Sequence, residues 1–96
     1  MRVSREDFSE KPVVFTDHAR LRMLQRGARK EDVVEAIRVG QKEPGQRGLF
    51  LYRLNLQFSR EWDGQYYAIQ QVVAVVAEEQ RRFVVVNTRS TFRRKQ

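Results

Sequence analysis

Apolar residues recur with helical spacing in the first part of the chain. A first helix is predicted to begin at Thr16 or Asp17, since either can cap a helix N-terminus, and to end at Gly27, a favoured C-terminal residue. A second is predicted over 31–39, where Val33, Val34, Ala36 and Ile37 share one face. Its early acids, Glu31 and Asp32, are interpreted as favourable partners of the helix dipole rather than as catalytic groups.

The hydrophobic period changes from 3.6 to 2 after residue 48. The stretch 41–48, with Pro44, Gly45 and Gly48, is predicted to be a loop. Apolar and polar residues then alternate over 50–59, which is typical of a half-buried strand. The dipeptide Asp63-Gly64 marks a hairpin turn.

Two further strands are predicted over 66–77 and 82–88, and Phe92 is assigned to a short fourth segment. Because both helices precede the strands, the expected fold class is α+β. Its two N-terminal helices are expected to pack on one face of a three- to four-stranded antiparallel sheet.

The chain length suits a single domain over 1–96. Residues 1–12 are interpreted as a polar lead-in, 13–92 as the globular core and 93–96 as a basic tail. Val13-Val14-Phe15 is expected to be extended and to pack against the core. No apolar run is long enough to cross a membrane, and the N-terminus has no apolar signal-peptide core.

The charge distribution indicates a polyanionic partner. The net charge is +7, and most of it lies after residue 80, where the chain holds basic residues and no acid. Arginine prevails over lysine, and its planar fork matches phosphate and stacks on bases. Four arginines of this region are predicted to bind the phosphate backbone of a nucleic acid: Arg81, Arg82, Arg93 and Arg94. The expected partner is RNA, with an acidic protein partner as the alternative.

The residue types exclude several chemistries. With no cysteine and one histidine, the chain cannot form a disulfide or a cysteine-based zinc site, and no metal or other cofactor is expected. It also lacks the glycine-rich nucleotide motifs and the GxSxG motif. The absence of cysteine fits a cytoplasmic protein.

One helix face carries the remaining candidate chemistry. His18, Arg22 and Arg26 recur at i, i+4 and i+8, so they form one cationic stripe on the first helix. Metal-free RNA cleavage needs a group that transfers protons near neutral pH and cations that stabilise the charge growing on phosphorus. A histidine near a helix start is also commonly a surface or capping residue, and the spacing alone leaves both interpretations open.

A resemblance to a known family extends this interpretation. Residues 15–27, with His18, Arg22-Met23 and Arg26-Gly27, resemble the opening of the bacterial family known as domain of unknown function 4258. The acidic helix after it and the valine-rich strands also fit, so the resemblance covers about 13–90. The family is similar in layout to the RelE-like RNase toxins, which implies a toxin-like RNase function.

The resemblance also implies site residues. His18, Arg22 and Arg26 match the family's motif, and Thr88 matches a polar residue on its last strand. Arg89 is expected to complete the site with Thr88. Two departures stand out: Arg29-Lys30 replaces the usual hydroxyl cap of the second helix, and Arg89 follows Thr88 where a nearby tyrosine is expected. If that tyrosine takes part in the chemistry, the chain is expected either to cleave RNA weakly or only to bind it.

Three functions therefore remain open. The first is a metal-independent endoribonuclease of the toxin type, with catalytic residues His18, Arg22, Arg26, Thr88 and Arg89. The second is a nucleic-acid-binding module without catalysis. The third is a protein-interaction domain for an acidic, antitoxin-like partner. For the four aromatic residues that could stack bases, packing within the protein is the favoured interpretation: Tyr52, Trp62, Tyr66 and Tyr67.

Overall fold

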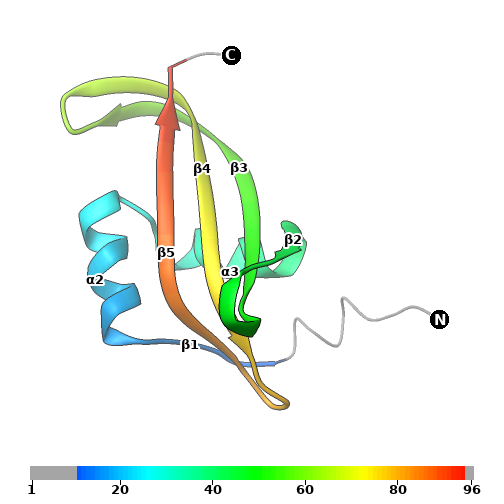
Figure 1. Ribbon diagram of the computed structural model, residues 1–96. Helices are drawn as coiled ribbons and strands as arrows, with labels where there is room; N and C mark the ends of the chain where they lie inside the picture. The colour runs from blue at the N-terminus through cyan, green and yellow to red at the C-terminus, as the bar shows by residue number, and fades with distance from the viewer. Residues whose placement is uncertain (1–10, 95–96) are drawn as a thin grey trace.

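A curved five-stranded sheet with two helices makes up the part of the chain that the computed structural model describes, residues 11–94 (Figure 1). In chain order the elements are β1 (Val13–Phe15), α2 (Asp17–Arg26), α3 (Lys30–Val39), β2 (Gln41–Pro44), the short 3₁₀ turn η1 (Gln46–Gly48), β3 (Phe50–Trp62), β4 (Gln65–Glu78) and β5 (Phe83–Arg93). The α+β class is confirmed.

The sheet corrects the predicted topology. Its strand order is β1-β5-β4-β3-β2, and it is mixed because β1 runs parallel to β5, whereas a three- to four-stranded antiparallel sheet was expected. The extended segment expected over 13–15 does exist. However, it pairs with a strand about seventy residues later in the chain, Val14 lying opposite Val84. No local sequence pattern specifies such a long-range pairing.

The predicted loop over 41–48 is wrong in its first half. Gln41–Pro44 forms β2, which pairs antiparallel with β3 at the edge of the sheet. Its sequence lacks hydrophobic alternation because an edge strand can be exposed on both faces. Ion pairs help to hold it, since Lys42 contacts Glu78 at 2.9 Å and Glu43 contacts Arg53 at 2.6 Å.

The first helix agrees with its predicted bounds. Thr16 is the N-cap and its Oγ1 accepts a hydrogen bond from the Ala19 amide at 3.1 Å, while Gly27 ends the helix in the left-handed conformation that glycine favours. Ala19 and Met23 are buried against the sheet. Leu21 and Leu24 face outward and are exposed.

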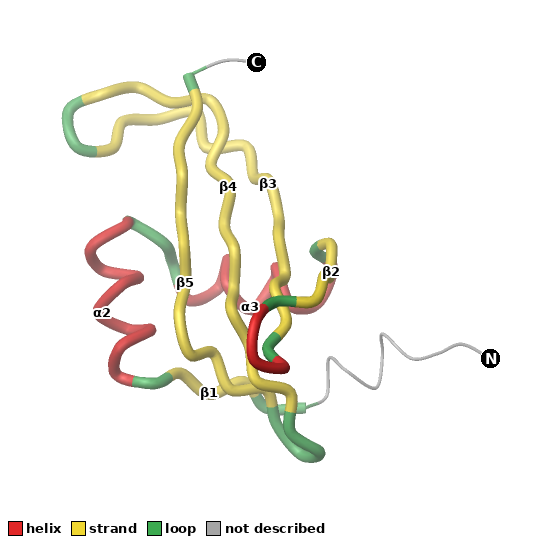
Figure 2. Tube along the Cα trace, viewed as in Figure 1, coloured by secondary structure: helices red, strands yellow, loops and turns green. Residues whose placement is uncertain are grey.

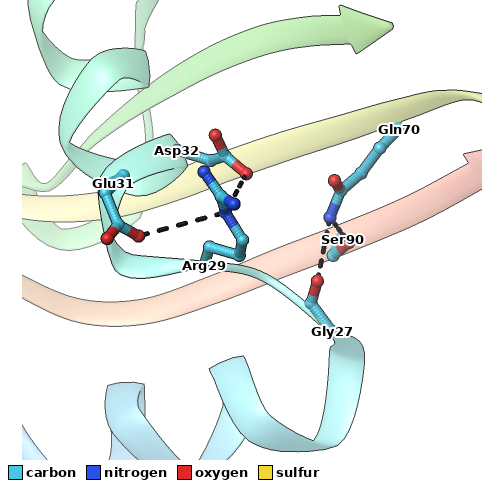
Figure 3. A network of polar contacts seen from close by, with 6 residues as sticks. All are labelled: Gly27, Arg29, Glu31, Asp32, Gln70 and Ser90. Atoms are coloured by element: carbon cyan, nitrogen blue, oxygen red, sulfur yellow. Dashed lines mark hydrogen bonds and ion pairs between the residues drawn. The ribbon is translucent and has the colours of Figure 1, made fainter. Parts of the chain in front are cut away.

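The second helix begins one residue earlier than predicted and lacks a side-chain cap. Its N-cap is Arg29, whose side chain makes no capping hydrogen bond. Instead, Arg29 Nε lies 3.5 Å from Asp32 Oδ2 and 3.9 Å from Glu31 Oε1 (Figure 3). These acids therefore take part in electrostatics at the helix start, in line with the prediction.

Both helices cover the same face of the sheet, as predicted. Buried residues of α2 and α3 share one cluster with inward-facing residues of β3, β4 and β5. The last strand is longer than expected, because Phe92 belongs to one continuous β5 rather than to a separate segment (Figure 2). The face opposite the helices, here called the open face, carries Val73 and Val75, which are buried by their neighbours.

A β-bulge divides β5 into two parts. Val85 lies opposite Val76 and Asn87 lies opposite Val75, so Val86 is an extra residue on β5. Before the bulge, Phe83 and Val85 point toward the helices. After it, the even-numbered residues are the inward ones, as the buried Thr88 and Ser90 show.

The β3–β4 hairpin bends toward the C-terminal end of α2 (Figures 1 and 2). Asp63 and Gly64 form its turn with φ of 55° and 84°, which confirms the predicted Asp-Gly turn. At the bend, Trp62 stacks on Phe92 with ring centroids 5.6 Å apart. Phe58 and Tyr67 also contact Phe92.

The predicted lead-in lies largely outside the described residues, and the predicted tail lies half outside them. Of the lead-in, Lys11 donates a hydrogen bond to the Glu79 carbonyl, and the Pro12 carbonyl accepts one from the Phe83 amide. Of the tail, Arg93 is the last residue of β5. Among residues 11–94, no helix is long and apolar enough to cross a membrane.

Candidate nucleic-acid interface

The start of α2 is fastened to β5, which places His18 beside that strand. The Thr16 amide donates to the Val85 carbonyl at 3.0 Å, and Thr16 Oγ1 donates to the Val86 carbonyl at 3.4 Å. Because Ala19 points into the core, the helix is held in one rotation about its axis. His18, one residue earlier, is therefore exposed beside the sheet rather than beneath it.

A cavity of about 550 Å³ opens next to His18. We call it the His18 cavity. It is lined by His18, Gly45, Gln46, Arg47, Leu49, Leu51, Val75, Val86, Asn87 and Arg89. Among the described residues, its lining contains two arginines, two carboxamides and one imidazole over an aliphatic floor, and no carboxylate. That composition favours an anionic ligand.

Arg47 reaches this cavity from a tight loop. It occupies the left-handed region with φ 58° and ψ 35°, between Gly45 and Gly48. The loop is closed by the Gly45 amide bonding to the Leu49 carbonyl at 2.8 Å and by the Leu49 amide bonding to the Gln46 carbonyl at 3.0 Å. A non-glycine residue in this region costs conformational energy and is enriched at binding sites.

Arg89 reaches the cavity from the open face of β5 and is exposed. Its neighbour across the sheet is Val73, and beyond Val73 lies Arg53. Arg53 is neutralised by Glu43 and also donates to Gln71 Oε1 at 3.3 Å. In contrast, Arg89 forms no ion pair with any residue from 11 to 94, so its charge is available to a ligand.

Thr88 does not join Arg89 at the site as predicted. It is fully buried on the face that the helices cover, and its Oγ1 has no hydrogen-bond partner among residues 11–94. Consecutive strand residues point to opposite faces, so Thr88 and Arg89 cannot present their side chains together. The bulge at Val86 determines which of these two side chains points to the open face.

The cationic stripe exists on α2, but only His18 lines the His18 cavity. Arg22 is half-buried, and its Nε is buried without a hydrogen-bond partner in the described part of the chain. Arg26 is exposed and lines a second cavity near Trp62. The three residues therefore lie in a line beside β5, two of them arginines, rather than converging on one point.

The four arginines predicted to grip RNA fall into two separate groups. Arg81 and Arg82 precede β5, whereas Arg93 and Arg94 end it, and this strand of 11 residues is about 35 Å long. Arg82 is also paired with Glu79 at 2.7 Å. The basic C-terminal sequence is thus a line along the molecule, not one patch.

Gln70 connects α2 to the sheet beside this line of charge. Its buried Nε2 donates to the Gly27 carbonyl at 3.2 Å and to Ser90 Oγ at 2.9 Å (Figure 3). Since Thr16 is bonded to Val85 and Val86, both ends of α2 are fixed to β5 or its neighbour. The helix therefore runs in the same direction as β5.

The resolved pKa shift lies away from both cavities, at Glu78. Burial alone would raise the pKa of this carboxyl, but hydrogen bonds from Tyr52 and Lys42 outweigh burial, so the pKa lies below its ordinary value of 4.5. Tyr52 is completely buried, and Trp62 and Tyr67 pack on Phe92. The packing interpretation is confirmed for these three rings, whereas Tyr66 is exposed.

Comparison with known proteins provides no relative: no family model, no curated protein and no solved structure matches this chain. The resemblance to the family of domain 4258 and to RelE-like toxins therefore stays a prediction. Within the described range, no three potential metal-binding side chains come together.

Sequence reasoning missed the contribution of residues 45–49 to the candidate site. Arg47 was assigned only to the predicted loop, although a guanidinium group matches phosphate geometry and two glycines lie close to it in the sequence. Asn87, which precedes Thr88, was not assigned to the site. Both lie beside His18 because strands far apart in the sequence are neighbours in the sheet.

Proposed function

We propose that this protein binds RNA and cleaves it without a metal ion, as a toxin-like endoribonuclease. The observation that carries the proposal is the His18 cavity, in which one imidazole and two arginines lie together and no carboxylate of residues 11–94 joins the lining. The net charge of +7 and the line of arginines along β5 support a polyanionic substrate. The resemblance to the family of domain 4258, whose layout is similar to that of the RelE-like toxins, favours the same reaction.

In the proposed reaction, His18 acts as the general base or acid. A base removes the proton of the ribose 2′-hydroxyl, and the 2′-oxygen attacks the adjacent phosphorus. The bond from phosphorus to the 5′-oxygen breaks, and that oxygen takes up a proton from an acid or from water. The products are a 2′,3′-cyclic phosphate and a free 5′-hydroxyl, with no oxidant or co-reactant needed.

Arg47 and Arg89 are assigned to the scissile phosphate. Both line the cavity beside His18, and guanidinium groups hold two phosphate oxygens at once. They would stabilise the additional negative charge of the pentavalent transition state. Arg22 and Arg26 would follow the neighbouring RNA backbone along α2. Thr88 has no direct contact with substrate in this proposal because it is buried.

The first experiment incubates a structured RNA with the purified protein in EDTA and compares wild type with His18→Ala. We expect cleavage to persist in EDTA and to fall by about 100-fold or more in His18→Ala, the usual contribution of general acid–base catalysis. Arg20→Ala is the matched control, because Arg20 is exposed on the same helix and lines neither cavity. Equal cleavage by wild type and His18→Ala would refute the catalytic assignment.

A binding protein without catalysis is the second candidate. The observation that favours it is that, within residues 11–94, no hydrogen bond orients the His18 ring, whereas a catalytic histidine is usually held by a further group. This candidate predicts no cleavage, RNA affinity that falls steeply with salt, and little effect of His18→Ala. Arg89→Gln would weaken binding and flatten the salt dependence.

A further inference from the structure

A second cavity lies at the opposite end of α2 from His18. It has a volume of about 560 Å³ and is lined by Gln25, Arg26, Trp62, Asp63, Tyr67, Ser90, Thr91 and Phe92. We call it the hairpin cavity, because the β3–β4 hairpin supplies one wall and α2 with β5 supplies the others. Its volume is within the range of small-molecule sites.

The aromatic side of this cavity is held in place by packing. Trp62 stacks on Phe92 at an interplanar angle of 23°, and Tyr67 lies 5.2 Å from Phe92 between ring centroids. Gly27 packs directly against the Trp62 ring, since a methyl group at Gly27 would come within 2.8 Å of it. The cavity therefore offers fixed apolar surface, which suits a flat aromatic ligand.

The polar side combines one cation with one carboxylate. Arg26 and Asp63 both line the cavity, and neither forms an ion pair in the described range. Asp63 is held at the hairpin turn with φ 55°. A carboxylate accepts two parallel hydrogen bonds, and guanine is the RNA base that presents two adjacent N–H donors, at N1 and N2.

The two cavities are connected by the cationic face of α2. His18 and Arg26 are eight residues apart, which corresponds to about 12 Å along a helix. A few nucleotides of a single strand span such a length. Arg22 lies between them on the same stripe, so a strand lying beside β5 would meet one of these three side chains at each turn of the helix.

We propose that the hairpin cavity binds a guanine base of single-stranded RNA a few nucleotides from the phosphate at His18. Asp63 accepts hydrogen bonds from N1 and N2 of guanine, the Trp62 and Tyr67 side supplies apolar contact, and Arg26 contacts the nucleotide's phosphate. This inference deepens the proposed function and rests on it for the position of the neighbouring phosphate. The base preference itself rests on the hairpin cavity alone.

The test uses Trp62 as the probe, since it is the only tryptophan in the chain and lines the cavity. Its fluorescence is titrated with GMP, AMP, CMP and UMP at equal ionic strength, with corrections for absorbance by the nucleotides. We expect saturable quenching with GMP at a concentration at least about tenfold lower than for the other three, the discrimination typical of one bidentate base contact. Equal responses to all four nucleotides would overturn the proposal.

Asp63→Asn is the decisive variant. Asparagine adopts the left-handed conformation, and Asn-Gly is the most favoured pair for this turn, so the hairpin is preserved. We expect Asp63→Asn to lose the preference for GMP, because an amide cannot accept both hydrogen bonds. Asp17→Asn removes an acid that lines neither cavity and should keep the preference. Unchanged preference in Asp63→Asn would also overturn the proposal.

This readout separates the two proposals. GMP binding that depends on Asp63, in a protein that cuts no RNA, would support the guanine site and refute the nuclease. Cleavage that needs His18 but shows no base preference, together with no GMP response, would support the nuclease and refute the guanine site.

Discussion

At the residue scale, the candidate site depends on side chains whose direction is set by their neighbours. Arg89 is available to a ligand because it lies on the open face, whereas Arg53, in the same row across the sheet, is neutralised by Glu43. Sequence alone placed Arg53 on a predicted strand and Arg89 directly after one. It could not tell them apart, because the ion pair joins β2 to β3, and β2 was not predicted.

Gly27 provides a test of how tightly the hairpin packs on α2. Gly27→Ala would place a methyl group 2.8 Å from Trp62 and would also require φ of 71° from a residue with a Cβ. We expect a loss of more than about 2 kcal/mol in the free energy of unfolding, measured by urea denaturation.

The matched control for this change is Gly64→Ala. Gly64 also has a positive φ, but a methyl group there meets nothing within 4 Å. It should cost only the backbone strain of about 1 kcal/mol. Equal losses of unfolding free energy in the two variants would mean that Trp62 does not pack closely against Gly27.

At the scale of elements, hydrophobic period predicted the helices and the long strands well. Each of these elements buries one face against its neighbours. Apolar residues therefore recur along its sequence with the period of a helix or of a strand. Neither β2 nor the parallel pairing of β1 was predicted, and the reasons differ. The first has no buried face to produce a pattern, and the second has its partner about seventy residues away.

The attachment of α2 to the sheet is testable at Gln70. Its side chain is buried and donates to the Gly27 carbonyl and to Ser90 Oγ. Gln70→Leu leaves these acceptors without their donor, so we expect a loss of about 1–3 kcal/mol in the free energy of unfolding. Amide hydrogen exchange should accelerate in the last turn of α2.

Gln71→Leu is the control for this element. Gln71 follows directly in β4, but it lies on the open face, where its amide donates to Asn55 and accepts a long hydrogen bond from Arg53, which keeps its ion pair with Glu43. A change within about 0.5 kcal/mol is expected there. If Gln70→Leu and Gln71→Leu lost equal stability, the loss could not be assigned to the hydrogen bonds that join α2 to the sheet.

At the scale of the whole molecule, stability should depend on pH through Glu78. Its folded pKa lies below the ordinary value of 4.5, so the folded state holds the ionised form more strongly than the unfolded chain does. The stabilisation is complete above that value and is lost as pH falls through the lowered pKa.

Urea unfolding of wild type and Glu78→Gln across this acidic range measures the effect. Wild type should be the more stable protein at neutral pH, and the difference should shrink as the solution becomes more acidic. Glu61→Gln, at an exposed position with no ion pair within residues 11–94, should show no such convergence. A constant gap between wild type and Glu78→Gln at every pH would contradict this account.

The β-bulge at Val86 also determines where β5 can change in length. Simple alternation from Phe83 and Val85 would turn Arg89 toward the helices and Thr88 toward solvent, and the insertion reverses both. Deleting Val86 would remove the bulge and make Val85 and Asn87 consecutive opposite Val76 and Val75, so Thr88 would stay buried and Arg89 would stay on the open face. A one-residue deletion elsewhere in β5 that left the bulge in place would turn the residues beyond it to the opposite face, so the bulge is where this strand can lose a residue without exchanging its faces.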